Sequence, residues 1–161
     1  MSKKEVYYLT LSILYIFYGL VQTLNGLVSI VSIEPIQICI KLGSICIPNI
    51  FPDFFAGVSL LTIGLLFITT LYYHRVDKKK SEGYLLVGWI LAVLLFILNI
   101  LEIAANILDA YYPIIFGKEP NFIWSLSTDP WGFAPQLLLG ILSLPIYSSI
   151  KSYLTELFPG K

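Results

Sequence analysis

Long apolar runs separated by short polar segments dominate this chain of 161 residues. The runs cover about residues 6–32, 53–73, 83–112 and 132–153. Each reaches the length of roughly 18 or more residues that a helix needs to cross a bilayer. The pattern predicts an all-α integral membrane protein, in which residues 1–161 form a single transmembrane domain built as a bundle of four helices.

The composition agrees with a membrane protein and excludes some partners. Hydrophobic residues make up 57% of the chain and charged residues 12%, whereas a soluble domain has about 25% charged residues. The formal net charge is zero, so bulk electrostatics gives no indication of a nucleic-acid partner.

Cationic residues predict the orientation of the helices. Only Lys41 and Lys118 lie in the first and third of the segments between runs, and all other cations lie on the opposite side. By the positive-inside rule, we expect a cell-membrane protein with both termini in the cytoplasm. The cations on the expected cytoplasmic side are Lys3, Lys4, Arg75, Lys78, Lys79, Lys80, Lys151 and Lys161.

The first external loop, residues 34–52, alternates apolar and polar residues before and after a short turn sequence. This pattern predicts a small extracytoplasmic β-hairpin. With Leu42 and Gly43 at the turn, Cys39 would lie opposite Cys46, and a disulfide between them becomes geometrically possible. The alternative is two reduced thiols that are buried as small hydrophobic groups.

The third apolar run contains four strongly polar residues, Asn99, Glu102, Asn106 and Asp109. Their spacings of three, four and three residues place them on one face of a helix. A carboxylate within a membrane-length helix needs a partner or a water-filled neighbour. We therefore expect any binding site to lie on this face.

Polar residues in the other runs lie at a similar depth, near the expected outer surface. Their convergence predicts an outward-facing polar vestibule, because isolated polar groups that face lipid would lose their hydrogen-bond partners. The alternative is structural: the amides bond across helices, with Glu102 as a protonated acceptor. The candidate vestibule residues are Gln22, Asn25, Asp53, Asn99, Glu102, Asn106, Asp109 and Gln136.

Two further features concern helix packing. Gly19 and Gly26, and likewise Gly57 and Gly64, are seven residues apart. Small residues at this spacing form a groove along a helix in which a neighbouring helix can approach closely. Pro145 interrupts the fourth run and predicts a kink or a local opening there.

Reactive chemistry is sparse. His74 is the only histidine, and the two cysteines do not form a Cys-x-x-Cys pair. The chain has no phosphate-binding glycine loop and no Ser-His-Asp set. We therefore predict no catalytic residue, no metal site and no cofactor. An intramembrane enzyme that uses Glu102 and Asp109 as acid and base is a third hypothesis.

The sequence suggests two functions. The first is a non-catalytic accessory or structural subunit of a larger membrane complex of the respiratory or transport type. The second is a small carrier, or a protein that binds a lipid or small molecule in the vestibule around Glu102. The expected partners are membrane lipid and other membrane subunits or a second copy of this chain.

Overall fold

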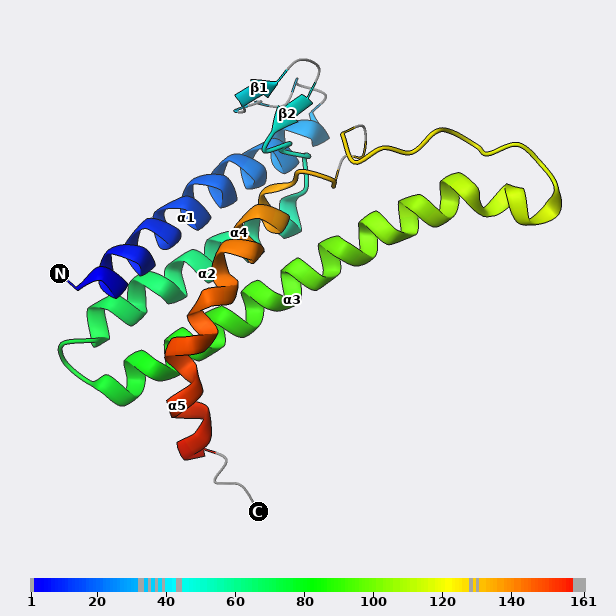
Figure 1. The fold of residues 1–161 in the computed structure, drawn as a ribbon. Helices are drawn as coiled ribbons and strands as arrows, with labels where there is room; N and C mark the ends of the chain where they lie inside the picture. Colours follow the sequence, from blue (N-terminus) through cyan, green and yellow to red (C-terminus); the bar gives the residue numbers. More distant parts are fainter. Residues whose placement is uncertain are drawn as a thin grey trace.

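Helices make up most of this computed structural model, which describes residues 2–31, 34, 36, 38, 40–42, 45–127, 129 and 131–157 (Figure 1). Two short strands precede the second helix. The elements are α1 (Lys3–Ile30), β1 (Ile40–Leu42), β2 (Ile45–Ile47), α2 (Phe54–Tyr73), α3 (Lys78–Tyr111), the 3-10 helix η1 (Tyr112–Phe116), α4 (Pro135–Ser143), the 3-10 helix η2 (Leu144–Ile146) and α5 (Tyr147–Leu157).

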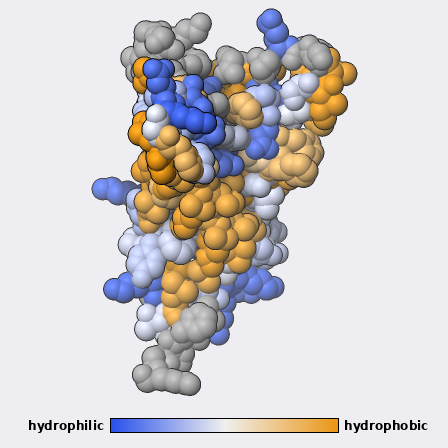
Figure 2. Space-filling view, turned by 90° about the vertical axis from the view of Figure 1, so that its right-hand side faces the viewer, coloured by the Kyte–Doolittle hydropathy of each residue, from blue (hydrophilic) through white to orange (hydrophobic). Residues whose placement is uncertain are grey.

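Three helices in the described part of the chain, α1, α2 and α3, are long and apolar enough to cross a membrane. Figure 2 shows an apolar band across the middle of one face of the molecule, with hydrophilic residues towards both ends. The expected fourth span is not one continuous helix. It is divided into α4, η2 and α5, and the break contains Pro145, because proline has no N–H to donate and its ring clashes with the preceding turn.

Polar side chains begin each of the three long helices. Ser2 and Glu5 form a capping box at the start of α1. Asp53 accepts a hydrogen bond from the Ala56 backbone N–H at 3.0 Å, and Asp77 caps α3 in the same way. These caps satisfy backbone donors that the helices leave unpaired. The starts of α2 and α3 therefore follow directly from the two aspartates.

Helices α1 and α2 pack closely along glycine positions. A Cβ at Gly19 would lie 2.7 Å from the Leu61 backbone nitrogen, and a Cβ at Gly64 would lie 2.7 Å from Ile16 Cγ1. These separations are too short for any side chain, so the helices can approach this closely only where glycine is present. The glycines at this contact, which we call the α1–α2 seam, are Gly19, Gly26, Gly57 and Gly64.

The apolar core lies where α1, α2, α3 and the last helices meet. Tyr15 and Phe67 are almost completely buried and pack edge to face, with ring centroids 5.7 Å apart. The Tyr15 hydroxyl also hydrogen-bonds to Ser143 of α4 at 2.9 Å. Helix α4 contacts α3 closely at Gly140, where a Cβ would lie 2.6 Å from Phe96 Cβ.

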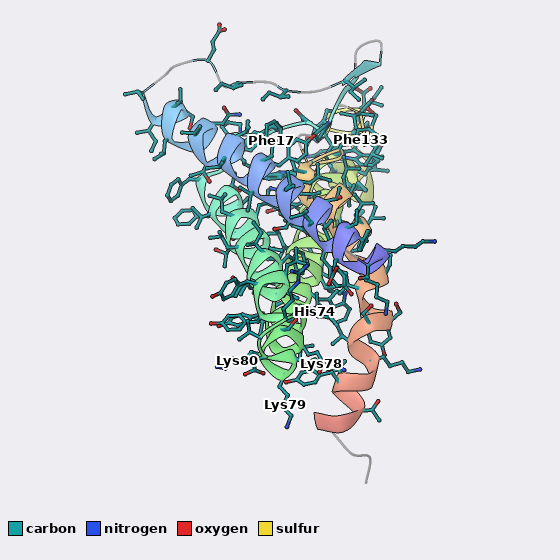
Figure 3. All side chains as sticks on the ribbon, turned by 90° about the vertical axis from the view of Figure 1, so that its left-hand side faces the viewer. Phe17, His74, Lys78, Lys79, Lys80 and Phe133 are labelled. Carbon is teal, nitrogen blue, oxygen red and sulfur yellow. The ribbon has the colours of Figure 1, made fainter. Side chains whose placement is uncertain are left out.

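One end of the bundle is rich in lysine. Figure 3 shows Lys78, Lys79 and Lys80 together at this end, close to the link between α2 and α3. His74 at the end of α2 lies 3.6 Å from Glu5 of α1. We call this the lysine end and the opposite end the outer end.

Helix α3 separates from the other helices towards the outer end. At the lysine end it packs on α2, where Ser81 donates a hydrogen bond to the Thr70 carbonyl at 2.9 Å. Figure 1 shows the other end of α3 projecting away from the bundle, with the chain returning to α4 through an extended segment. Helices α2 and α3 thus contact each other at the lysine end and diverge towards the outer end.

The strands β1 and β2 are antiparallel, with Lys41 opposite Cys46 and Leu42 opposite Ile45. The predicted register, with Cys39 opposite Cys46, is wrong by two residues. The turn fixes the register of a hairpin, and Leu42, predicted as a turn residue, is instead the last residue of β1 and pairs with Ile45. The shift removes the geometric argument for a disulfide, and Cys39 itself lies outside the described residues.

Candidate functional site

A cavity of about 200 Å³ lies at the outer end, where α3 has diverged from α2. Four of the predicted vestibule residues line it, and they come from three different elements. Trp131, which precedes α4, completes the wall. We call this site the outer cavity; its lining residues are Asp53, Phe55, Ala56, Ser59, Leu95, Leu98, Asn99, Glu102, Trp131 and Gln136.

A second cavity of about 330 Å³ continues from the first towards the middle of the bundle. The two cavities share Ser59, Leu95 and Leu98. Together they form a groove between α2 and α3, which we call the α2–α3 groove. The additional lining residues of its inner part are Val58, Thr62, Ile63, Leu91 and Leu94.

The inner part of the groove is apolar although it contains two hydroxyl groups. Ser59 and Thr62 each donate a hydrogen bond, at 2.9 Å, to a carbonyl of their own helix. Their hydroxyls therefore need no further partner in the groove. The groove is amphipathic as a result, with an apolar inner part and a polar outer cavity.

The amides that line the outer cavity are buried without complete hydrogen bonding. Asn99 is 2% exposed; its amide nitrogen donates to the Trp131 carbonyl at 3.4 Å, and its oxygen has no partner in the described part of the chain. Gln136 is 3% exposed, and neither its oxygen nor its nitrogen has a partner among the described residues. Buried polar groups are nearly always satisfied in folded proteins, so orphaned atoms beside a cavity indicate a missing partner.

The two carboxylates of the outer cavity differ in their bonding. Asp53 uses one oxygen to cap α2. Glu102 is exposed and makes no hydrogen bond or ion pair with any described residue. No lysine, arginine or histidine is among the described residues that line the cavity, so none of these residues supplies a counter-ion to Glu102.

Four predicted vestibule residues lie outside the cavity, and two of them, Gln22 and Asn25, belong to α1. Gln22 is fully buried, and both of its polar atoms lack a partner among the described residues, but it does not line the cavity. Asn25 has a structural role: its side chain accepts a hydrogen bond from the Ile36 N–H and donates one to the Ile36 carbonyl, both at 2.8 Å. Asn25 therefore fixes the chain that follows α1.

Asn106 of α3 belongs to a separate network above the cavity. Its amide donates to both oxygens of Asp129, at 3.1 and 3.2 Å. Asp129 is 4% exposed and also accepts hydrogen bonds from the Trp124 indole N–H at 2.6 Å and from the Trp131 backbone N–H at 2.9 Å. This network holds the segment before α4 against α3, and thereby places Trp131 at the cavity.

The importance of Asp129 was not predicted from the sequence. An aspartate before a proline favours a turn in which the side chain bonds to the backbone two residues later, and the bond from the Trp131 N–H is of this kind. The Asp-Pro pair at residues 129 and 130 is therefore the sequence signal from which this role of Asp129 could have been predicted. Asp109, by contrast, is exposed, and only its backbone carbonyl accepts a hydrogen bond, from Asn121 at 3.0 Å.

Among the described residues, Asn25 and Asn99 form hydrogen bonds with backbone groups of Ile36 and Trp131. No hydrogen bond joins any two of the side chains of Gln22, Asn25, Asn99, Glu102 and Gln136. The Asn99 bond nevertheless joins α3 to the segment that precedes α4, so the structural role of these residues stays a hypothesis beside the vestibule. Over the same part of the chain, the structure has no group of three or more His, Cys, Asp or Glu residues that could hold a metal ion.

The comparisons with known proteins give one match. A family model described as the MJ0565 integral membrane domain matches residues 2–152. No curated protein and no solved structure matches this chain.

Proposed function

We propose a function for this chain, which belongs to the MJ0565 integral membrane domain family. The proposal is that the α2–α3 groove binds an amphiphilic molecule from the membrane. As an integral membrane protein it is surrounded by such molecules. The observation that carries the proposal is the continuity of an apolar groove with a cavity that contains orphaned buried amides. Ligand sites commonly combine an apolar surface with a few polar groups that fix the orientation.

The proposed arrangement in the membrane has four spans, with the interrupted segment of residues 135–157 as the fourth. The lysine end faces the cytoplasm in this arrangement, because lysine and arginine favour that side. The outer cavity then lies in the outer leaflet. A bound amphiphile would place its chain along Leu94 and Leu98 and its polar head beside Glu102, with each part in the environment that it requires.

The groove can be tested with photoreactive amphiphiles on the purified protein in maltoside micelles. We choose three hexadecyl probes that carry a diazirine in the chain and end in an amine, an alcohol or a carboxylate. We expect at least one probe to label residues of the groove in a saturable way, that is, competed by excess unlabelled amphiphile. Labelling of α1 at Leu20 and Leu24, which are exposed on another face, should not saturate.

A matched pair of variants controls this experiment. Ser59 lies in the wall shared by both cavities, so Ser59→Trp fills the groove and should abolish saturable labelling. Leu65 is on the same helix, is 57% exposed and lines none of the groove, so Leu65→Trp should leave labelling unchanged. Saturable labelling that is absent for all three probes, or that survives Ser59→Trp, would contradict the proposal.

We propose the role of an accessory subunit as the second candidate function, supported by the outer end of α3. This helix has 34 residues, which corresponds to about 51 Å, compared with about 30 Å for a bilayer core. Large apolar side chains at and beyond its end are exposed: Leu108 is 69%, Ile115 77% and Ile123 85% exposed. A second membrane subunit that covered this end would remove apolar surface from water.

Mild extraction from native membranes tests this second function. A subunit partner should comigrate with the wild-type protein and separate from the Leu108→Ser and Ile115→Ser variants. The Leu65→Ser variant is the control, because it introduces the same change at an exposed site that is remote from the end of α3. Comigration that persists in both end variants, or a lone monomer of the wild type, would argue against the accessory role.

A further inference from the structure

We infer that the outer cavity selects amphiphiles whose head is a cation with hydrogen-bond donors, such as a protonated primary amine. This inference rests on the proposed function and names the class of ligand for the same site. It is drawn from the charges, the unpaired acceptors and the aromatic wall of the outer cavity.

The charge of the cavity wall is the first argument. Asp53 and Glu102 both line the cavity, and the described lining contains no cationic side chain. A carboxylate at the depth of the membrane requires a partner, and Glu102 has none within the described protein. An ammonium head would provide that partner, whereas an anionic head would meet two carboxylates without a compensating charge.

The unpaired atoms are the second argument, independent of charge. The side-chain oxygens of Asn99 and Gln136 are buried acceptors without a donor among the described residues, two acceptors against one unpaired donor, the Gln136 nitrogen. Both residues line the cavity. A primary ammonium group carries three N–H donors in a compact arrangement. It can therefore bond to Glu102 and to one or both amide oxygens at the same time, which a quaternary ammonium group cannot do.

Trp131 provides the third argument. The residue lines the cavity, and its ring is held against Phe51 with the centroids 4.9 Å apart. The Asp129 network fixes its backbone. Tryptophan is the side chain whose ring attracts cations most strongly. A wall formed by two carboxylates, amide oxygens and an indole ring favours a cation over a neutral or an anionic head.

The apolar inner groove determines the remainder of the ligand. Ser59 and Thr62 bond to their own helix, so the groove beyond the cavity offers a polar chain no hydrogen bonds. The ligand thus carries its charge at one end and an alkyl or acyl chain at the other. A free amine without a chain would forgo the burial of apolar surface in the groove.

The test compares heads on one chain. Unlabelled hexadecylamine, hexadecanol and hexadecanoate compete for saturable photolabelling of the groove in the intact protein, in neutral maltoside micelles at pH 7. We expect the amine to compete at a concentration about tenfold lower than the alcohol, equivalent to about 1.4 kcal/mol, and the carboxylate to compete most weakly. Hexadecyltrimethylammonium, which lacks N–H donors, should fall between the amine and the alcohol.

Two variants connect this preference to one carboxylate. Glu102→Gln keeps the size of the side chain and removes its charge, so the preference for the amine should fall to less than about threefold, equivalent to about 0.7 kcal/mol. Asp109→Asn makes the same change on the same helix, at an exposed residue outside the cavity, and should retain the full preference. The fold of both variants is checked by circular dichroism.

The outcomes separate this inference from the proposed function. Equal competition by all heads, or an amine preference that Glu102→Gln leaves intact, overturns the inference while groove binding stands. The absence of saturable labelling by any probe overturns the proposed function itself. A preference that is lost in Glu102→Gln and kept in Asp109→Asn supports both.

Discussion

Helix α2 has two neighbours and contacts them in opposite ways. Along the α1–α2 seam, glycines from both helices bring the backbones into contact, and the Ser12 hydroxyl donates to the Gly64 carbonyl at 2.7 Å. Along α3, the contact closes only at the lysine end and opens into the α2–α3 groove at the other. The first contact is closed by backbone approach, and the second leaves apolar surface of both helices lining a cavity.

The buried polar groups differ in the same way. Ser12, Thr70, Ser81 and Ser143 are buried, and each donates to a backbone carbonyl. The amides that line the outer cavity are equally buried but have unpaired atoms. A protein loses stability when a buried polar group is left unpaired. Such a loss is typical of sites that bind something, where the missing partner comes from the ligand.

The largest expected effect tests the α1–α2 seam. Gly57→Ala should lower the free energy of unfolding by about 3 kcal/mol, because its Cβ would overlap the backbone of Thr23 and the two helices would have to separate. Gly83→Ala is the control, since only the Tyr153 hydroxyl, at 3.9 Å, lies near the added carbon. Thermal unfolding in detergent, followed by circular dichroism, measures both. Similar melting temperatures for the two variants would mean that the seam is not tightly packed.

The next effect concerns the segment that closes the outer end of the groove. Asp129→Ala should cost about 2 kcal/mol, because Asn106 and the Trp124 indole N–H lose a buried, charged acceptor. Asp109→Ala removes an exposed carboxylate and should change stability by less than about 0.5 kcal/mol. Tryptophan fluorescence during unfolding would report both. An Asp129→Ala variant as stable as Asp109→Ala would show that this network does not hold the segment.

A pair of serine variants compares the two faces of α2 directly. Ser12→Ala removes the interhelical bond to Gly64 and should destabilise the protein by about 1 kcal/mol. Ser59→Ala removes only a bond to its own helix, in the wall of the groove, and should have an effect near zero. Denaturant unfolding of both variants gives the difference. Equal losses would remove the distinction between the seam and the groove.

The smallest expected effect has the opposite sign. Gln136→Leu replaces a buried amide that has no partner among the described residues, so stability should stay the same or rise by less than about 1 kcal/mol. Saturable labelling of the groove by the amine probe should become weaker. If Gln136→Leu unfolds the protein, the amide is satisfied in the membrane, and the argument from orphaned atoms fails.

Much of this architecture could be predicted, and the reasons are local. The prediction of an integral membrane protein is confirmed by the family match and by the three long apolar helices. The aspartates that begin α2 and α3 and the break at Pro145 act on the backbone within one turn. Likewise, Asn99 and Glu102 are three residues apart on one helix, and both line the outer cavity.

Features that depend on contacts between residues far apart in the sequence could not be predicted from local patterns. The positions of Asn25 and Gln136 along their apolar runs predicted a similar depth in the membrane. In the structure, Asn25 bonds to the backbone of Ile36, whereas Gln136 lines the cavity. The register of β1 and β2 pairs Leu42 with Ile45, whereas the sequence placed Leu42 in the turn. The divergence of α3 has no local signal, because the polar face of its outer half predicts a site but not a separation of helices.

The sequence by itself determined the apolar helices, their starts at capping residues and the polar face of the third run, because these depend on interactions within a few residues. Only the tertiary structure decided that α2 closes on α1 and opens towards α3. Which helices touch, and where they separate, depends on how side chains such as Gly57 and Thr23 meet across elements. That fit of surfaces involves residues that are far apart in the chain.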